Sequence, residues 1–398
     1  MNAKPLDGIT VVTFEQAVAA PFATRQLADL GARVIKVERD TGDFARDYDT
    51  TVYGQSSYFT WLNRSKESIV LDLKSEHGRE AARQLLLRAD VVVQNLAPGA
   101  VDRLGIGAHD ALELNPRLIY TSISGYGSGG PYQDKKAYDL LIQCEAGLLS
   151  VTGTKDEPAK VGISIADISA GMYAYSGILT ALLARENTGL GDIIEVSMLE
   201  ALGEWMAQPY LYAEYGGIQQ PRTGAAHATI APYGPFETVD GTVFLGVQNE
   251  REWHRFCERV LGAPFIASDP RFVTNSDRVR NTAALTGIIA EKIRTRHTED
   301  VLAELENAGI ANSRIRDMAE FSAHPQLAAR DKWRNVGSPH GPVRVMTPPA
   351  RFQSFEARLD PVPALGEHTD SILAEIGFAR QLNSRSGDPK PSLEMEVI

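Results

Sequence analysis

The sequence predicts an α/β protein with a large part built on a Rossmann-like parallel sheet and a smaller α+β part. Two observations predict this division. Up to residue 197, short apolar runs alternate with helical stretches, and strands separated by whole helices pair in parallel through right-handed crossovers. Residues 225–318 instead hold two strand-like runs followed by a helix, which predicts a compact α+β unit.

The large part reads as strand, helix and strand in turn from its first residues. Ile9–Phe14 is an apolar run after the turn Asp7-Gly8, and Phe22–Leu30 reads as a helix that Gly31 ends in a left-handed cap. The next strands and helices are expected, in order, at Arg33–Glu38, Ser68–Leu73, Glu76–Arg88, Asp90–Gln94 and Arg117–Ser122. This alternation places helices on both faces of the sheet.

The remaining chain is expected to start with a long helix from Ile168 to about Gly189. The elements expected after it are a strand at Ile193–Ser197, a helical stretch at Leu199–Tyr215, strands at Ala231–Phe236 and Thr242–Val247, a helix at Trp253–Leu261, an extended stretch from Pro339 to Phe355 and a last helix at His368–Phe378. The resulting division is 1–197 and 356–380 for the large part, 225–318 for the small part, 198–224 and 319–355 for two linkers, and 381–398 for a polar tail.

The composition excludes several kinds of partner. The 398 residues fit two domains, and a net charge of −11 argues against nucleic acid and membrane surfaces, since both need a basic face. Cys144 and Cys257 lie far apart without metal-ligand spacing, which is typical of reduced thiols in a cytoplasmic protein. The first residues lack a signal-peptide pattern, and no apolar run reaches the roughly 20 residues of a spanning helix. We therefore expect a cytoplasmic protein.

A glycine-rich segment, Gly125-Tyr-Gly127-Ser-Gly129-Gly130, follows a predicted strand and matches a dinucleotide-binding motif. That motif needs a helix N-terminus directly after it and an acidic residue about 20 residues further on. Pro131 and a turn-like stretch, VTGTKDEPAK, stand at these places instead. We interpret Gly125 and Gly127 as part of a loop that can move beside a ligand.

Asp167 stands at the start of the predicted long helix, within Ser164-Ile-Ala-Asp-Ile-Ser-Ala-Gly171. An aspartate at such a place is most often an N-cap, whose side chain accepts a hydrogen bond from a free amide and meets the positive end of the helix dipole. The same position also suits a carboxylate nucleophile, because the side chain is held in place and flanked by small residues. This segment alone leaves both interpretations open.

Five segments occur in a recognisable order: Pro5-Leu-Asp-Gly8, Leu30-Gly-Ala-Arg-Val-Ile-Lys-Val-Glu-Arg39, Asn95-Leu-Ala-Pro-Gly-Ala-Val-Asp-Arg-Leu-Gly105, Ser124-Gly-Tyr-Gly127 and the Asp167 segment. Together they resemble the class III CoA-transferases, the family of formyl-CoA transferase and carnitine CoA-transferase. The similarity runs from residue 5 to about residue 375. No one of these segments is decisive, and the ordered set carries the resemblance.

The resemblance implies that Asp167 is the catalytic aspartate and that coenzyme A enters as a substrate thioester, with no metal or redox cofactor. The residues that match the family's CoA-binding positions are Gln16, Ala17, Arg39, Leu71, Lys74, Asn95, Leu96, Arg103 and Lys136. The cations among them suit the phosphates of CoA. The residues expected beside the substrate or in covering loops are Gly125, Gly127, Tyr138, Arg222 and His227. The resemblance also implies a homodimer of two interlocked, ring-like chains.

The implied reaction moves CoA from an acyl-CoA such as succinyl-CoA to a small carboxylic acid through an aspartyl anhydride and an aspartyl-CoA thioester. The chain as a whole looks closest to a branch that uses dicarboxylates such as succinate, itaconate or mesaconate. Formyl-CoA transferase has His and Gln where this chain has Gln16 and Val18, and its tetraglycine loop has no counterpart here. The nearest flexible stretch is Gly224-Ala-Ala-His227.

Two other functions remain open. The α-methylacyl-CoA racemases share the fold and move a proton with a His/Asp pair, but Tyr138 stands where their His precedes the aspartate that corresponds to Asp139. A tyrosine pKa of ~10 is far from the range that a general base prefers. A non-catalytic CoA-binding protein would need no Asp167 at all.

Overall fold

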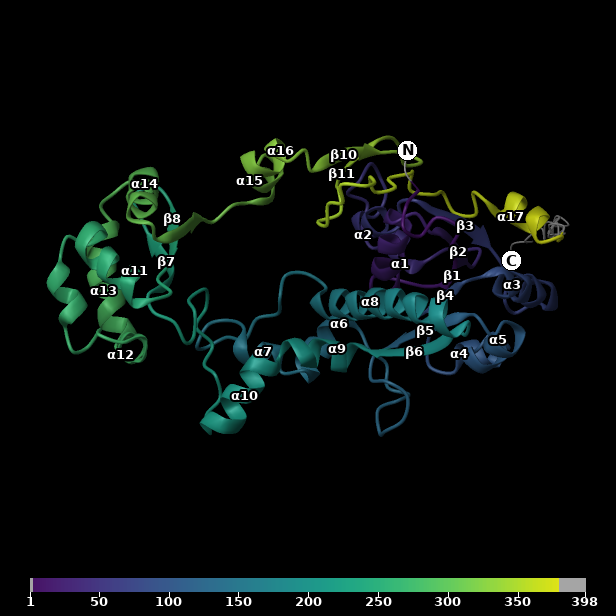
Figure 1. The fold of residues 1–398 in the computed structure, drawn as a ribbon, viewed down its shortest axis with the longest axis horizontal. Coiled ribbons are helices and arrows are strands. Elements are labelled where there is room, and N and C mark those ends of the chain that lie inside the picture. The colour runs from purple at the N-terminus through teal and green to yellow at the C-terminus, as the bar shows by residue number, and fades with distance from the viewer. Residues whose placement is uncertain (1–2, 379–398) are drawn as a thin grey trace, which may run out of the picture.

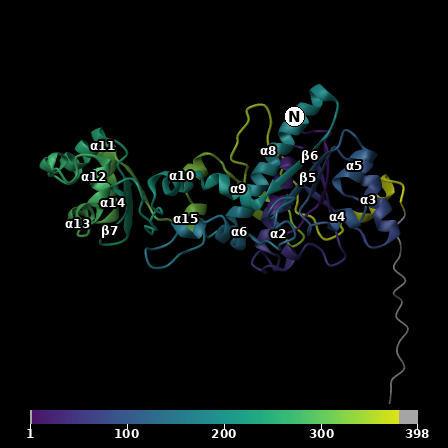
Figure 2. The ribbon, with the colours of Figure 1, turned by 90° about the horizontal axis from the view of Figure 1, so that it is seen from below.

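A computed structural model describes residues 3–378, so residues 379–380 and the predicted tail at 381–398 lie outside the described residues. The described chain forms two bodies at opposite ends of the long axis, as both views show (Figures 1 and 2). The chain passes from the large body to the small one and returns by a second route (Figure 1). None of the described helices has the length and apolar character that crossing a bilayer requires.

The large body is built on one six-stranded sheet. Its strands are β1 (Thr10–Phe14), β2 (Arg33–Glu38), β3 (Lys66–Val70), β4 (Val91–Gln94), β5 (Ile119–Ser124) and β6 (Asp192–Ser197). They pair in the order β3-β2-β1-β4-β5-β6, and every pair is parallel. The predicted parallel sheet is therefore confirmed, and its strand order is the one found in Rossmann folds.

Most helices of the large body pack on the two faces of this sheet. The helices of this body are α1 (Ala19–Asp29), α2 (Ser57–Leu62), α3 (Glu76–Arg88), α4 (Ala100–Arg103), α5 (Ala108–Leu114), α6 (Asp139–Glu145), α7 (Leu148–Val151), α8 (Ile165–Thr188), α9 (Met198–Trp205) and α17 (Thr369–Glu375). Val91 and Val93 belong to the hydrophobic cluster shared with α1 and α8, whereas Val92 belongs to the cluster shared with α3 and α17. Successive strand residues point to opposite faces, so burial on both faces explains the uninterrupted apolar run.

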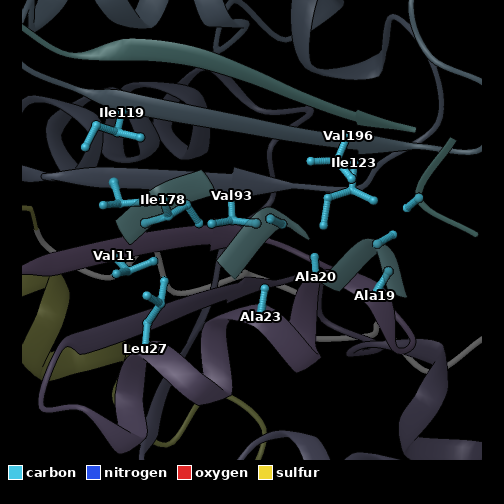
Figure 3. Packing of buried hydrophobic residues seen from close by; sticks show 14 of the residues in the cluster. Val11, Ala19, Ala20, Ala23, Leu27, Val93, Ile119, Ile123, Ile178 and Val196 are labelled. Atoms are coloured by element: carbon cyan, nitrogen blue, oxygen red, sulfur yellow. The ribbon is translucent and has the colours of Figure 1, made fainter. Parts of the chain in front are cut away.

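The crossing of α1 and α8 depends on small side chains. Ala19, Ala20 and Ala23 are fully buried in the cluster between α1 and the sheet (Figure 3). On α8 the facing residue is Gly171, where an added Cβ would lie 2.6 Å from the backbone oxygen of Ala19. The two helices therefore approach more closely than any larger residue at position 171 would permit.

The start of α8 differs from its prediction. The helix begins at Ile165 rather than Ile168, and its N-cap residue Ser164 makes no side-chain capping bond. Instead, a carboxylate on α6 accepts the first amides of α8. Residues close to Ser164 in the sequence do not indicate this contact. The other end of α8 agrees with the prediction, since Gly189 adopts a left-handed conformation with φ of 72°.

The C-terminal stretch of the described chain covers the edge strand β3. The amide of Ser68 donates to His368 Nδ1 over 3.2 Å, and the amide of Val70 donates to Thr369 Oγ1 over 3.1 Å. The amide of His368 in turn donates to the carbonyl oxygen of Ser68. These bonds satisfy edge amides that would otherwise be open to another chain.

The small body has a hydrophobic cluster of its own. Its antiparallel sheet contains β7 (Tyr233–Glu237), β8 (Thr242–Gly246) and β9 (Ala311–Arg314). Its helices are α11 (Glu250–Arg255), a π-helical turn (Phe256–Val260), a 3-10 turn (Pro264–Ser268), α12 (Asn275–Arg280), α13 (Thr282–Ile293) and α14 (Thr298–Ala308). The boundaries given above for the domains and linkers stay a prediction.

The two connecting routes hold short elements. The outward route contains α10 (Ala207–Gly216), and the return route contains α15 (Met318–Ser322), α16 (Pro325–Ala329), β10 (Trp333–Val336) and β11 (Val343–Met346). β10 and β11 form an antiparallel hairpin. The stretch from Pro339 to Phe355 was predicted to be extended, and Val343–Met346 within it forms a strand that the weak period-2 pattern did not indicate.

Candidate active site at the carboxyl edge of the sheet

Most of the predicted site residues directly follow strands of the parallel sheet. Gln16 and Ala17 follow β1, Arg39 follows β2, Leu71 and Lys74 follow β3, Asn95 and Leu96 follow β4, and Gly125 and Gly127 follow β5. Parallel strands end at one common edge, and ligands of open α/β sheets bind there, at the point where the strand order reverses. In this sheet that point lies between β1 and β4.

Asn95 and Gln16 meet at this reversal point. Asn95 Oδ1 accepts the amide of Gln16 over 2.8 Å, and Asn95 Nδ2 donates to the carbonyl oxygen of Gln16 over 2.9 Å. The next residue, Ala17, has a φ of 60°, and its amide donates to Asp43 Oδ1 over 3.1 Å. Side chains from two neighbouring loops thus hold the turn after β1 in a conformation that alanine rarely adopts.

A buried ion cluster lies beneath this turn. Lys66 Nζ is 2.6 Å from Glu15 Oε1, and Lys36 Nζ is 2.8 Å from Asp43 Oδ2, with all four side chains inaccessible to solvent or nearly so. Burial alone would raise the pKa of Glu15, but the charges of Lys66 and Lys36 hold it at about 2. Burial lowers the pKa of Lys66 to about 8 against the attraction of Glu15. The cluster therefore anchors Glu15 and Asp43 on either side of the turn.

Asp167 reaches the same edge from α8. A crossover helix runs opposite to the parallel strands it connects, so the first turn of α8, which precedes β6, lies at their carboxyl edge. Asp167 is the third residue of this helix and caps nothing, which removes the N-cap interpretation. Its carboxylate makes no hydrogen bond or ion pair with any residue in 3–378.

The surroundings of Asp167 disfavour its charge. Burial, and next the negative charge of Asp139, raise the pKa of Asp167 to about 7. Asp139 Oδ1 accepts the amides of Ala166 and Asp167 over 2.8 and 3.1 Å. A carboxylate that is largely buried, keeps a partly exposed side and has no hydrogen-bond or ion-pair partner among the described residues is suited to attack a bound substrate.

Sequence reasoning missed Tyr48 and its neighbour Tyr58 near this carboxylate, and it named Asp139 only as the aspartate that follows Tyr138. Burial, Asp43 and then Asp167 raise the pKa of Tyr48 to about 12, so its phenol lies within electrostatic range of Asp167. Tyr48 packs edge-on against Tyr58, with ring centroids 5.4 Å apart. A concentration of aromatic residues between Phe44 and Phe59 was the signal available for the two tyrosines.

The glycine loop after β5 packs against the segment that leads into α6. A Cβ at Gly125 would lie 2.2 Å from the Cβ of Ala137, so only glycine fits there. Tyr138, the next residue, is the N-cap of α6 and is 65% exposed. The structure thus brings Gly125 close to the segment that holds Tyr138. Asp139 follows directly, and its carboxylate contacts the first turn of α8.

Four predicted cations, Arg39, Lys74, Arg103 and Lys136, are exposed. Arg39 Nε donates to the carbonyl oxygen of Gly42 over 3.1 Å. None of the four takes part in an ion pair within residues 3–378. Arg39 and Lys74 lie in the loops after β2 and β3, Arg103 ends α4, and Lys136 precedes α6, so all four belong to segments that follow the carboxyl ends of strands.

Arg222 and His227 lie elsewhere. Arg222 Nε and one terminal nitrogen donate to the carbonyl oxygens of Thr154 and Lys155, each over 2.9 Å. His227 stacks on Tyr233 with ring centroids 5.2 Å apart. No described contact joins either residue to Asp167. In the described part of the chain, no cluster of three or more His, Cys, Asp or Glu side chains could hold a metal ion.

Comparisons with known proteins found a matching family model, relatives and solved structures. The family model described as CoA-transferase family III matches residues 6–369. The human succinyl-CoA:glutarate CoA-transferase is 34% identical, with 94% of this chain and 86% of that protein aligned. The succinyl-CoA:mesaconate CoA-transferase of Haloarcula hispanica is 31% identical, with 96% and 99% aligned. A CAIB/BAIF family protein from Brucella suis has a crystal structure that superposes with a TM-score of 0.83 at 36% identity, covering 94% of this chain and 100% of that one.

Proposed function

Because the chain belongs to CoA-transferase family III, we propose that it moves CoA from an acyl-CoA donor such as succinyl-CoA to a small dicarboxylic acid, with Asp167 as the covalent carrier. The single observation that carries this proposal is the unpaired, desolvated carboxylate of Asp167 at the carboxyl edge of the sheet. A non-catalytic CoA-binding protein would gain nothing from holding a carboxylate in that state.

The first half of the proposed reaction loads CoA onto the enzyme. An Asp167 oxygen attacks the acyl carbon of the donor thioester, the carbon–sulfur bond breaks, and CoA leaves as a thiolate beside a mixed anhydride. The thiolate then attacks the aspartyl carbon, which releases the donor acid and leaves an aspartyl-CoA thioester. Holding the carboxylate beside the thioester provides an effective molarity worth about 7–11 kcal/mol.

The second half repeats these steps with the acceptor. A carboxylate oxygen of the acceptor attacks the aspartyl thioester and displaces the thiolate, and the thiolate attacks the acyl carbon of the acceptor. This produces acceptor acyl-CoA and restores the Asp167 carboxylate. No net proton or electron is exchanged, so the reaction needs no metal or redox cofactor. Water must be kept away, since both intermediates hydrolyse, and the loop at Gly125–Gly130 is our candidate for that cover.

Coenzyme A would be held by the carboxyl-edge residues. Its phosphates suit the unpaired cations Arg39, Lys74, Arg103 and Lys136, because charge-assisted bonds to phosphate are strong. The turn at Gln16 and Ala17 and the backbone at Leu71 and Leu96 would lie along the rest of the molecule.

The acceptor is proposed to be a five-carbon dicarboxylate such as mesaconate or itaconate. Glutarate and mesaconate, which the names of two relatives contain, are both five-carbon dicarboxylates. The second carboxylate of such an acid needs a cation or several donors. His227 and the remaining donors of Arg222 stay candidates for this contact.

Trapping the covalent intermediate tests the proposal. With acyl-CoA and hydroxylamine, wild-type protein should acquire a hydroxamate at Asp167, detectable by peptide mass spectrometry. In Asp167→Ala and Asp167→Asn, the adduct should vanish and transfer should fall by at least about a thousandfold, because the effective molarity of the nucleophile is lost. Asp167→Glu should also be severely impaired, since one methylene displaces the attacking oxygen. CoA binding and thermal melting of all three should stay near wild type.

Two results would count against this function. Normal transfer in Asp167→Ala would remove the covalent role of that residue. Exchange of the α-proton of a 2-methylacyl-CoA with solvent deuterium, without any trapped adduct, would instead favour the racemase.

A further inference from the structure

We propose that Asp139 is a positioning residue that holds the first turn of α8 and keeps Asp167 reactive. This inference rests on the proposed role of Asp167 as the nucleophile. Nothing in the reaction steps above uses Asp139, yet its carboxylate is in direct contact with the backbone that carries the nucleophile.

Asp139 replaces the missing cap of α8. The N-cap residue Ser164 contributes no side-chain bond, and the first amides of a helix have no partner within it. Asp139 Oδ1 accepts two of them, from Ala166 at 2.8 Å and from Asp167 at 3.1 Å. The acceptor comes from a different helix, 28 residues earlier in the chain, so it ties the position of Asp167 to α6.

Asp139 is itself fixed by Gln143, a buried residue one turn further along α6. Gln143 Nε2 donates to Asp139 Oδ2 over 2.6 Å, and Gln143 Oε1 accepts the amide of Val161 over 3.0 Å. These bonds form a chain that links Val161, before α8, to Gln143 and Asp139 on α6, and then to the amide of Asp167. The arrangement leaves Asp139 little freedom to turn away.

The charge of Asp139 acts on Asp167 at the same time. Burial, followed by this charge, raises the pKa of Asp167 to about 7. The other titratable groups near Asp167 are the phenol of Tyr48, whose pKa is raised to about 12 by burial, by Asp43 and then by Asp167, and the phenol of Tyr138, which interacts with Tyr48.

Most of the remaining charged groups on helices that pack against α8 are paired, as Glu145 of α6 is with Lys135. Glu200 in the first turn of α9 is exposed and forms no ion pair within residues 3–378. On α1, Arg25 pairs with Asp29 at 2.8 Å, and on α9, Glu204 accepts from Tyr173. Within residues 3–378 no cation pairs with Asp167 to oppose the effect of Asp139.

Repulsion between the two carboxylates favours the reaction rather than opposing it. In the free enzyme the charge of Asp139 repels the deprotonated carboxylate of Asp167. As the anhydride forms, negative charge leaves Asp167 for the departing thiolate, so the repulsion is relieved in the transition state. An unfavourable interaction that is present only in the ground state lowers the barrier.

The activity of the enzyme should depend on the protonation of Asp167. Below pH about 7 Asp167 takes up a proton and cannot attack, so kcat/KM of the wild-type enzyme should fall as the pH falls through about 7. Asp139→Asn keeps an acceptor oxygen for the α8 amides but removes the charge. Its acid limb should therefore move to lower pH, by at least about half a pH unit. Its plateau kcat should fall, with KM for acyl-CoA near wild type.

Labelling of Asp167 tests the inference without relying on transfer. A carbodiimide with an isotopically labelled amine reacts with protonated carboxyl groups, and peptide mass spectrometry reports the labelling of Asp167 in the full chain against pH. The wild-type midpoint should lie near 7, and Asp139→Asn should lower it. Glu186→Gln, on an exposed part of the same helix, removes one charge without contacting the first turn and should leave it unchanged.

An unmoved midpoint in folded Asp139→Asn would overturn the inference, whatever its activity. Asp139→Ala, which loses the acceptor as well, should lower kcat further than Asp139→Asn. Equal kcat in the two variants would show that the bonds to α8 do not matter. If Asp139→Ala fails to fold, Asp139→Asn still decides the electrostatic part. Since labelling needs no turnover, a wild-type protein that labels as expected but transfers no CoA would refute the proposed function alone.

Discussion

Individual cations at the carboxyl edge fall into two groups that differ in how fully they are paired. Lys36 and Lys66 are enclosed by carboxylates in the buried cluster, and their bonds to Asp43 and Glu15 hold the two sides of the turn after β1. Arg39 and Lys74 are exposed and have no carboxylate partner among the described residues. Lys36 and Lys66 therefore stabilise the fold, whereas the unpaired charges of Arg39 and Lys74 are available to bind a ligand.

Truncating an unpaired cation should weaken CoA binding and leave the chemistry intact. For Arg39→Ala and Lys74→Ala we expect KM for acyl-CoA to rise about five- to thirtyfold, which corresponds to about 1–2 kcal/mol, with kcat nearly unchanged. The effect should shrink at high salt, because ions screen exposed charges.

Steady-state kinetics at two ionic strengths check this prediction. Arg88→Ala is a matched control, since Arg88 is an exposed cation in the last turn of α3, at the opposite edge of the sheet. Loss of kcat with unchanged KM in the Arg39 or Lys74 variant would contradict the binding role.

At the scale of elements, the position of the nucleophile depends on how α1 and α8 cross. Asp167 lies one turn before Gly171, the residue of closest approach to Ala19 on α1. The turn at Gln16 and Ala17 leads directly into α1. The crossing of α1 and α8 therefore sets the position of this turn as well as that of Asp167. Small residues at this crossing are therefore a requirement of the site as well as of the core.

Gly171→Ala should push the two helices apart. The new Cβ would lie 2.6 Å from a backbone oxygen that cannot rotate away, and overpacking of this kind costs about 1–3 kcal/mol. We expect a lower melting temperature and a reduced kcat. Gly177→Ala in the same helix is the control: its Cβ would meet Ile194 at an ordinary 3.4 Å. That variant should be neutral or more stable by up to about 1 kcal/mol, because alanine favours the helix. Equal melting temperatures for both variants would contradict this account.

At the scale of the whole molecule, two separate routes join the two bodies (Figure 1), and the outward route exposes large apolar side chains. On α10, Tyr210, Leu211 and Tyr215 are 59%, 50% and 82% exposed, and Trp205 at the end of α9 is 45% exposed. Large apolar side chains gathered and exposed on one segment are typical of a surface that another chain covers. We therefore keep the prediction that a second chain passes through the ring and covers them.

An interlocked dimer should not dissociate without unfolding. We expect light scattering and analytical ultracentrifugation to report a dimer on dilution to nanomolar concentration and in high salt, where a simple polar interface would separate. A matched pair of substitutions, Tyr210→Ser and the surface change Glu186→Gln, should lower thermal stability only in the first case. A monomer at micromolar concentration would refute the dimer and leave the role of Asp167 untouched.

The sequence by itself determined the elements whose signal is local. The apolar run around Val92 predicts a strand buried on both faces, and Gly189 predicts the end of α8, because periodicity and glycine conformation depend on neighbouring residues. The ordered motifs also indicated the family and drew attention to Asp167.

Only the tertiary structure decided what surrounds that aspartate. The bonds from Asn95 to Gln16 join residues 79 positions apart, and those from Asp139 to α8 join residues up to 28 apart. Each of these side chains could equally well have faced solvent without altering the local pattern of polar and apolar residues. Their partners are selected by how the strands order and the helices cross, and that selection depends on packing between distant segments, which a linear pattern does not record.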